Sequence, residues 1–231
     1  MAGSLHRLAA AAVHGLWGAA ARYGAIDSGT RRAGRFAAFG SGTRICFPAT
    51  SLMGEQWIEL GRDTLIAENV TLSAGMSPSH VPENQPLLRV GDRCVFGRGT
   101  GIVADWGIEI GNDVWTGHYV YVTDHNHGYE DLGTPPGLQI GRHERVRILD
   151  GAWLGHGTVV LPGVTVGRHA VVGAGSIVTS DLPDFCVAAG NPARVLRQHV
   201  TGEGWVRPFA APGREPGHPR RPSVSRSNPL V

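Results

Sequence analysis

The sequence places an aliphatic side chain at every sixth position between residues 148 and 178. The row consists of Ile148, Leu154, Val160, Val166, Val172 and Val178. A period of six fits neither the 3.6 residues per turn of an α-helix nor the two-residue alternation of an open strand. It fits a coil with flat faces and a corner every six residues, in which each aliphatic side chain points inward and stacks on its counterpart in the next coil. The repeat therefore predicts an all-β solenoid.

The same period recurs upstream and is interrupted twice. The upstream members are Leu60, Ile66, Leu72, Val90, Phe96, Ile102, Ile108, Ile110, Thr116 and Val122. The interruptions, residues 73–89 and 123–146, are rich in Pro, His, Asn and Gly. Such insertions form loops that leave a rigid scaffold, and loops of this kind commonly carry function. Of the two, the second loop is the more informative about function.

The two ends of the chain depart from the repeat. Apolar residues at helical spacing, among them Leu5, Leu8 and Leu16, predict an amphipathic helix within residues 1–35. We expect that helix to cover the open end of the solenoid, which would otherwise expose apolar side chains. Residues 36–197 form the predicted solenoid domain. Residues 198–231 turn to Gly, Pro, Arg and Ser, a composition that predicts a largely disordered tail.

Composition excludes several classes of protein. The 21 basic residues, all arginine, face 19 acidic ones, and a net charge of +2 excludes a globally basic nucleic-acid-binding protein. No apolar run reaches the length of about 18 residues that a membrane-spanning helix needs, so we expect no integral membrane segment. The three cysteines are far apart, with no CxxC pair, and indicate reduced, buried thiols of a cytoplasmic protein.

Three stretches of the sequence together resemble one known family. Residues 121–131 read YVTDHNHGYED, residues 153–155 read WLG, and residues 172–183 and 189–195 read VGAGSIVTSDLP and AGNPARV. Over residues 36–197 the chain is similar to the left-handed parallel β-helix acyltransferases, the hexapeptide-repeat family that contains the maltose and galactoside O-acetyltransferases. The resemblance implies a left-handed coil, acetyl-CoA as the acyl donor, and a homotrimer with its active sites in clefts between neighbouring subunits.

The resemblance assigns the general base to a loop histidine. In the family a histidine after a coil takes the proton of the acceptor hydroxyl, and His125 occupies that place; His127, two residues later, is the alternative. An imidazole with a pKa near 6.5 can remove that proton as the hydroxyl attacks a thioester. A carboxylate should orient the ring, and Asp124, Glu130 and Asp131 are all close in sequence. We expect the acceptor to contact Asp124, Asn126 and His127.

The donor side is also carried over from the family. Acyl transfer needs a hydrogen-bond donor aimed at the developing oxyanion, and the resemblance gives this role to the backbone N–H of His156. Trp153 matches an aromatic residue that lines the cleft. The remaining cofactor contacts that the resemblance implies are Gly173, Ala174, Gly175, Thr179 and Ser180 beside the pantetheine arm and Arg194 and Arg197 at the phosphates. The family often has lysine where Ser180 stands, and serine lacks the positive charge that lysine brings to a phosphate contact.

A metal site is the main alternative for the remaining histidines. His118, His143 and His169 suggest it, because zinc carbonic anhydrases share the hexapeptide-repeat fold and use three histidine ligands. The seven-residue spacing of His118 and His125 does not match that pattern. We therefore expect no metal.

The sequence favours a CoA-dependent O-acyltransferase that moves acetyl from acetyl-CoA to a hydroxyl of a sugar or polysaccharide precursor. Two alternatives stay open. One is an acetyltransferase whose acceptor is serine, an amino sugar or an antibiotic. The other is a non-catalytic β-helix that serves as an assembly scaffold.

Overall fold

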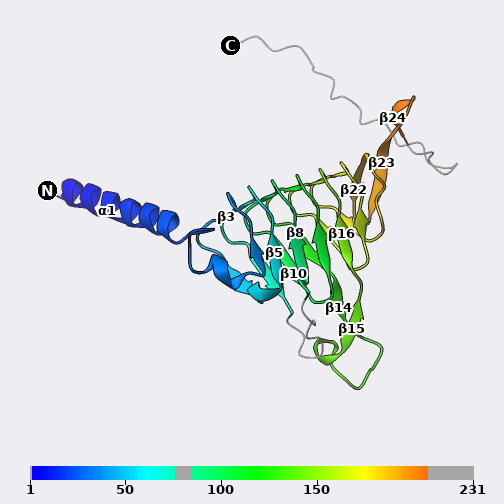
Figure 1. Ribbon diagram of the computed structural model, residues 1–231, viewed down its shortest axis with the longest axis horizontal. Helices are drawn as coiled ribbons and strands as arrows, with labels where there is room; N and C mark the ends of the chain where they lie inside the picture. Colours follow the sequence, from blue (N-terminus) through cyan, green and yellow to red (C-terminus); the bar gives the residue numbers. More distant parts are fainter. Residues whose placement is uncertain (1, 76–84, 208–231) are drawn as a thin grey trace, which may run out of the picture.

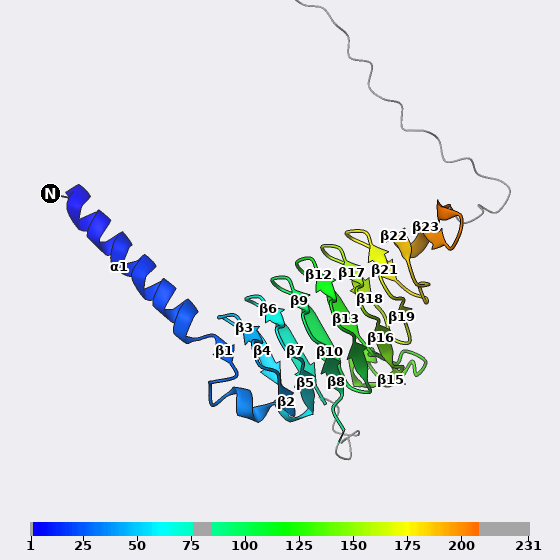
Figure 2. The ribbon, with the colours of Figure 1, turned by 45° about the horizontal axis from the view of Figure 1, so that its top comes forward.

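The chain winds into a three-sided coil of short parallel strands. A computed structural model describes residues 2–75 and 85–207 of the protein. Successive strands along the coil belong to different faces, so each sheet takes roughly every third strand and runs the length of the coil (Figures 1 and 2). The architecture is a parallel β-helix with three faces and one N-terminal helix.

The three faces are named here in the order in which each turn of the coil visits them from residue 44 onward. The first face contains β1 (Ile26–Asp27), β3 (Arg44–Ile45), β6 (Leu65–Ile66), β9 (Val95–Phe96), β12 (Trp115–Thr116), β17 (Trp153–Leu154), β20 (Val171–Val172), β22 (Cys186–Gly190), β23 (Ala193–Val200) and β24 (Gly204–Val206). The second contains β4 (Ser51–Met53), β7 (Thr71–Ala74), β10 (Gly101–Ala104), β13 (Tyr121–Thr123), β18 (Val159–Val160) and β21 (Ile177–Val178). The third contains β2 (Ala38–Phe39), β5 (Ile58–Leu60), β8 (Leu88–Val90), β11 (Ile108–Ile110), β16 (Val146–Ile148) and β19 (Thr165–Val166).

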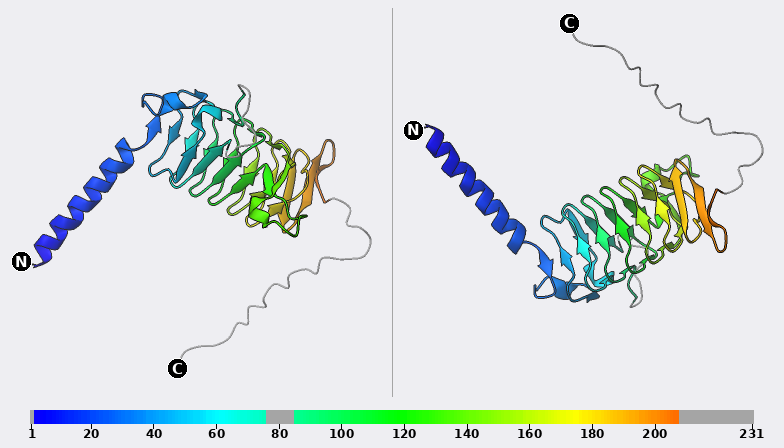
Figure 3. Two further views of the ribbon diagram at one scale, coloured as in Figure 1. Left: turned by 90° about the horizontal axis from the view of Figure 1, so that it is seen from below. Right: turned by 90° about the horizontal axis from the view of Figure 1, so that it is seen from above.

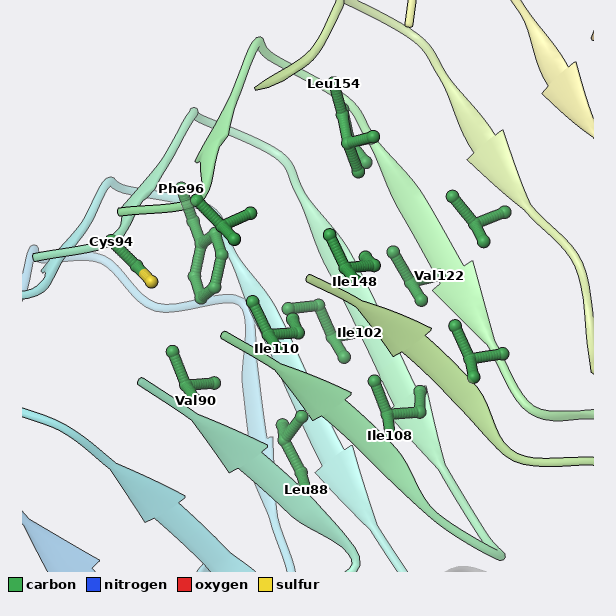
Figure 4. Packing of buried hydrophobic residues seen from close by; sticks show 14 of the residues in the cluster. Leu88, Val90, Cys94, Phe96, Ile102, Ile108, Ile110, Val122, Ile148 and Leu154 are labelled. Carbon is green, nitrogen blue, oxygen red and sulfur yellow. The ribbon is translucent and has the colours of Figure 1, made fainter. Parts of the chain in front are cut away.

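The six-residue row forms the core, as the repeat predicts. On each face the row members of consecutive coils pair directly, as Leu154 does with Val172 and Val160 with Val178. These side chains are fully buried, and Figure 4 shows their neighbours Ile102, Ile110 and Ile148 pointing into the same interior. Most two-residue strands turn one side chain inward, because a strand's next residue points to the opposite face of its sheet. Longer strands such as β8 bury two, here Leu88 and Val90.

The second interruption of the repeat forms a hairpin outside the coil. Between β13 and β16 the chain makes β14 (His125–His127), the short 3-10 helix η3 (Pro136–Leu138) and β15 (Ile140–His143), and β14 pairs antiparallel with β15. Figure 1 shows this hairpin at the edge of the coil. The first interruption lies partly outside the described residues.

The N-terminal helix does not cover the end of the coil, which corrects the expectation from the sequence. The helix α1 (Ala2–Tyr23) projects away from the first coil (Figure 3), and Leu5 and Leu16 are each 72% exposed. The open end is covered instead by the segment that follows, where Ile26 of β1 and Ala33 of the 3-10 helix η1 (Ala33–Arg35) are buried. Because these residues already shield the terminal coil, the apolar stripe of α1 has no surface there to cover.

The C-terminal end of the coil is extended by a hairpin. Strand β23 pairs antiparallel with β22 and with β24, and Val200 lies opposite Gly204. Residues 198–206, which the sequence assigned to the disordered tail, therefore include paired strand. Residues 208–231 lie outside the described residues, and the disorder expected there stays a prediction.

Two further predictions from the sequence concern the state of the cysteines and the presence of a membrane-spanning helix. Cys46, Cys94 and Cys186 are free thiols, and the last two are buried. Burial raises the pKa of the Cys94 thiol to about 11, so it stays protonated at neutral pH. Within the described ranges, no helix is long and apolar enough to cross a membrane.

Candidate active site

The candidate site begins where the chain leaves the second face. Strand β13 ends at Thr123, Asp124 turns inward, and His125 starts the hairpin strand β14. We call this edge, between the second and third faces, the base corner. The polar sequence at residues 124–127 breaks the hexapeptide rule, and that break is what releases the chain from the coil.

Asp124 is a buried carboxylate with many donors around it. Its side chain is fully buried, and it accepts hydrogen bonds from the backbone N–H groups of Asp105, Trp106 and Gly107. Burial acts to raise the pKa of Asp124, but the hydrogen bonds from His125 and from these backbone groups outweigh it and hold the pKa below its ordinary value. Asp124 is therefore a fixed negative charge at neutral pH. It lies beneath His125 and is closed to solvent, so the expectation that it contacts the acceptor is wrong.

His125 receives its orientation from Asp124. The Nδ1 atom of His125 lies 2.9 Å from Oδ1 of Asp124, and the imidazole side chain is 25% exposed. Because an ionised carboxylate only accepts hydrogen bonds, Nδ1 carries the proton and Nε2 keeps a lone pair. The hydrogen bond to Asp124 raises the pKa of His125 above 6.5, against the opposing effect of burial. The sequence left three carboxylates open as the orienting group, and the structure selects Asp124.

A second histidine and carboxylate pair lies beside the first. The Nε2 atom of His143 is 2.9 Å from Oδ2 of Asp105, a carboxylate that is 3% exposed. His143 on β15 faces His125 on β14, and the two rings stack with centroids 5.8 Å apart and planes 26° apart. Sequence reasoning treated His143 only as a possible metal ligand. The signal it lacked was the pairing of β14 with β15, which brings together residues separated by the loop.

Residues of the hairpin line two pockets. A pocket of about 290 Å³ is lined by both histidines, by His127 and by the apolar side chains of Leu138 and Ile140. A second, of about 590 Å³, is lined by residues that include Asn126, His127, Arg142 and Thr179. The smaller pocket is the one in which a hydroxyl could meet the lone pair on His125. Asn126 and His127 line both pockets, as residues that contact an acceptor would.

His127 has a different environment from His125. It is exposed, and its Nδ1 lies 3.4 Å from the backbone oxygen of Gln139, a long contact. Within residues 2–75 and 85–207, no carboxylate comparable to Asp124 fixes its ring or its tautomer. The geometry therefore favours His125 as the base over the alternative that the sequence left open.

The expected donor-side residues lie elsewhere on the coil. His156, Gly173, Ala174 and Gly175 gather at the edge between the first and second faces, which we call the glycine corner. The backbone N–H of Gly175 donates to the oxygen of His156 over 2.7 Å, so consecutive coils meet closely there. A Cβ on Gly155 would lie 2.6 Å from the backbone nitrogen of Ala174, which leaves no space for a side chain.

The remaining expected residues divide between the first face and the base corner. Trp153 is 53% exposed on the first face beside Trp115, at the edge of a shallow pocket of about 280 Å³. Arg194 and Arg197 also lie on the first face, in β23, and both are exposed. Thr179 and Ser180 follow β21 at the base corner, on the same side as His125. One copy of the chain therefore does not bring the base corner and the glycine corner together.

Three further histidines, His118, His156 and His169, make ring contacts. The ring of His156 packs against Tyr119 with centroids 5.6 Å apart and lies 6.4 Å from that of His118. His169 stacks on Phe185 at 5.4 Å. Over residues 2–75 and 85–207, no group of three or more His, Cys, Asp or Glu side chains is placed to hold a metal ion.

Two segments match known hexapeptide-repeat families. Residues 145–180 match the family described as bacterial transferase hexapeptide (six repeats), and residues 88–123 match the hexapeptide repeat of succinyl-transferase. Both segments lie within the coil, on either side of the hairpin.

Curated relatives are acetyltransferases by name. A galactoside O-acetyltransferase of Lactococcus lactis is 40% identical over 108 residues, covering 43% of this chain and 51% of its own length. The galactoside O-acetyltransferase of Escherichia coli is 31% identical over 148 residues, covering 64% of this chain and 47% of its own length. A Mycobacterium tuberculosis protein named as a probable acetyltransferase is 33% identical over 140 residues, covering 61% of this chain and 44% of its own length. The chain thus spans about half the length of the curated relatives it matches.

Solved structures share the fold. AntD, an N-acyltransferase from Bacillus cereus solved in complex with dTDP and 3-hydroxybutyryl-CoA, superposes with a TM-score of 0.60. It is 18% identical in sequence, and the match covers 74% of this chain and 89% of that one. At this identity the likeness concerns the fold of the coil.

Proposed function

The chain belongs to the hexapeptide-repeat acyltransferase family, and we propose that it is a CoA-dependent O-acyltransferase that moves acetyl from acetyl-CoA to a hydroxyl of a sugar or polysaccharide precursor. The observation that carries the proposal is the hydrogen bond between His125 and the buried Asp124 at the wall of a pocket. A coil that served only as a scaffold would have no use for an imidazole held in one tautomer beside a cavity. The coil is taken to be left-handed, the hand of the family.

The chemistry assigned to His125 is general-base catalysis. The lone pair on Nε2 accepts the proton of the acceptor hydroxyl while the oxygen forms a bond to the thioester carbonyl carbon. The carbon–sulfur bond then breaks, and the CoA sulfur leaves and takes up the proton from His125. The products are an ester and free CoA, and the enzyme returns to its starting state. Asp124 stabilises the imidazolium that exists between the two proton transfers.

The donor contacts are proposed on the family resemblance together with their chemistry. The backbone N–H of His156 is the oxyanion donor, and the exposed Ala174 and Gly175 beside it leave room for a narrow pantetheine arm. Trp153 lines the cleft, and Thr179 and Ser180 complete the arm's contacts. Arg194 and Arg197 suit the phosphates, because a guanidinium binds phosphate oxygens through two parallel hydrogen bonds.

We propose that the working enzyme is a homotrimer. The base corner and the glycine corner lie at different edges of one coil, so a site that contains both His125 and the backbone of His156 needs two copies. A closed three-fold ring would place the base corner of each copy against the glycine corner of the next and form three equal sites. The three free thiols, two of them buried, are consistent with a cytoplasmic enzyme.

A thiol-release screen tests the proposal. Acetyl-CoA is incubated with the protein and a panel of sugars, amino sugars, serine and simple amines, and free CoA is measured with a thiol reagent. The expected result is release with at least one hydroxyl acceptor and loss of release in His125→Ala. Release with amines alone would move the assignment to an N-acyltransferase. Absence of release with every acceptor, from a protein that also fails to bind acetyl-CoA, would favour the scaffold alternative.

A further inference from the structure

We infer that His143 and Asp105 form a second histidine and carboxylate pair that positions the ring of His125. The inference rests on the proposed function, since it gives His143 a part in the same acyl transfer. His143 is here a positioning residue, which acts through His125 and does not itself exchange a proton with the substrate.

The first observation is that the two pairs have the same construction. In each, an imidazole donates an N–H over 2.9 Å to a carboxylate that is almost closed to solvent, 0% exposed for Asp124 and 3% for Asp105. A buried carboxylate is costly unless it is hydrogen-bonded, so each aspartate holds its histidine firmly. A histidine needed only to fill space would not require one.

The second observation is that the two pairs are joined into a closed circuit. The backbone N–H of Asp105 donates to Oδ1 of Asp124 over 2.9 Å, the same oxygen that holds His125. The circuit closes through the stacked rings of His125 and His143. Displacement of any one member therefore disturbs the other three, and the ring plane of His125 is fixed from its face as well as from its edge.

The third observation is that His125 lies on an element that is less firmly held than the coil. His125 lies on a hairpin outside the rigid coil, and the β14 and β15 pairing shifts register between His125 and His127. The hairpin's outer residues are exposed, Leu132 at 99% and Leu138 at 76%. A base on such an element is held less precisely than one on the coil, and small displacements of catalytic groups lower the rate steeply. The hydrogen bond of His143 to Asp105 joins the second strand of the hairpin to the coil.

Two amide substitutions give a matched test. The side-chain nitrogen of glutamine reaches roughly the place of imidazole Nε2, whereas that of asparagine reaches only the place of Nδ1. His143→Gln keeps a donor for Asp105 and should retain most of the turnover. His143→Asn loses that donor and should lower kcat by about 10- to 100-fold with KM for acetyl-CoA unchanged, in line with a misplaced base. Equal losses in both variants, accompanied by an equal fall in Tm, would overturn the inference in favour of a general structural role.

A double-mutant cycle separates positioning from direct catalysis. If His143 acts through His125, then His143→Asn should cause no further loss when it is added to His125→Ala. A further loss of similar size in that background would show that His143 contacts the substrate itself, which overturns the positioning role.

An NMR titration makes the test independent of turnover. Imidazole resonances of the wild type and both His143 variants are followed with pH. We expect the midpoint of His125 to move in His143→Asn and to stay near the wild-type value in His143→Gln. This result is expected even if the acceptor screen finds no substrate, so the failure of the proposed function and of this inference are distinguishable. An unchanged His125 titration in His143→Asn would overturn the inference.

A separate observation, the exposed apolar stripe of α1, carries a second proposal. We propose that α1 lies on the surface of a membrane that contains anionic lipid. At 100° per residue, Leu5, Leu8 and Leu16 share one side of the helix, and they are 69 to 72% exposed. Arg7 and His14 lie on the opposite side. The helix is too poor in apolar residues to span a bilayer, so it can only lie in the interface.

The positive charge of α1 favours an anionic membrane over a second copy of the helix as the partner of the leucine stripe. The first 26 residues of the chain contain no Asp or Glu, while α1 carries Arg7 and Arg22. A bundle of identical helices would bring these arginines together with no acid to pair with them. Anionic headgroups supply the missing negative charge, and the acyl region receives the leucines.

Vesicle sedimentation tests the second proposal. The full chain is mixed with vesicles of phosphatidylcholine alone and of phosphatidylcholine with about a third phosphatidylglycerol. We expect binding to the anionic vesicles, weakened several-fold in high salt by screening. The double variant Leu8→Gln with Leu16→Gln should bind at least tenfold more weakly, because two buried leucines are lost. The matched control, Ala10→Gln with His14→Gln, alters the opposite side and should bind as the wild type does.

Two outcomes would overturn the second proposal. One is the absence of binding to anionic vesicles. The other is a fall in solution mass in the leucine double variant but not in the control, which would show that the stripe joins copies of the chain.

Discussion

The imidazole of His125 and the carboxylate of Asp124 form a 2.9 Å hydrogen bond in which the acid is wholly buried and the base is partly exposed. The order of exposure matters, because only the histidine can reach a substrate. Asp124, in turn, is anchored by three backbone N–H groups at the end of β10. The orienting group is therefore part of the coil, while the base lies on the hairpin.

Loss of the base should lower turnover strongly. We expect His125→Ala to lower kcat by about 10²- to 10⁴-fold, the usual size of a general-base contribution, with little change in acetyl-CoA binding. Steady-state kinetics and a binding titration measure the two effects. His127→Ala is the control and should cost much less, since His127 has no carboxylate partner among the residues that the structure describes. A severe loss in His127→Ala with activity retained in His125→Ala would transfer the base to His127.

Exchange of the carboxylate for an amide should reverse the tautomer of His125. In Asp124→Asn the amide oxygen can still accept from Trp106 and Gly107, but the amide NH₂ then faces Nδ1 of His125. Nδ1 must accept, the ring proton moves to Nε2, and the lone pair needed for catalysis is lost. We expect a loss of turnover comparable to that of His125→Ala while the fold is kept. Nitrogen-15 NMR of the imidazole reads the tautomer directly, and an unchanged Nδ1–H tautomer would contradict the mechanism.

The pH dependence of activity should follow the raised pKa of His125. The base works only when neutral, and the hydrogen bond to Asp124 favours the charged form. The acidic limb of kcat/KM should therefore lie above pH 6.5, with activity rising as pH increases through the raised pKa. A pH profile of the wild type checks this. A limb well below pH 6.5 would mean that Asp124 does not carry its negative charge in the free enzyme.

The assembly should be a trimer with shared sites. Light scattering should give about three times the 24.5 kDa mass of one chain. Mixed trimers test the sharing. His125→Ala damages the base corner and Ala174→Trp fills the glycine corner, and each alone should be inactive. Refolded together in equal amounts, they should recover about a quarter of the wild-type activity, because each site draws on two chains at random. Recovery of none would place the whole site in one chain.

The inward row should dominate stability. Leu154 is fully buried within the coil, and Leu154→Ala should lower the free energy of unfolding by about 2–5 kcal/mol through lost burial and the cavity left behind. Leu138→Ala, on the exposed 3-10 helix η3, removes the same atoms and should change it by less than about 0.5 kcal/mol. Denaturant unfolding measures both. Similar effects of the two substitutions would mean that the row does not form the core.

The sequence alone determined the coil. A period of six marks the inward positions of the coil, so the sequence predicts the row at 148–178 and its upstream members as core, and they are buried. The interruption at residues 123–146 likewise marked the place of the hairpin, because an insertion that breaks the repeat has no room inside it. Both results follow from local rules that each hexapeptide satisfies by itself.

Only the tertiary structure decided which groups meet. Asp105 and His143 are separated by a coil and a hairpin, and no spacing in the sequence relates them; their contact exists because β14 pairs with β15 beside the end of β10. The same holds for the choice of Asp124 over Glu130 and Asp131, since burial and backbone donors come from a neighbouring coil. The placement of α1 was also beyond the sequence. An amphipathic pattern predicts that one side of the helix is apolar, but it does not predict which surface that side contacts. Residues 25–36 cover the end of the coil, so that surface is not open to α1. Which of the two segments covers the coil depends on the three-dimensional packing.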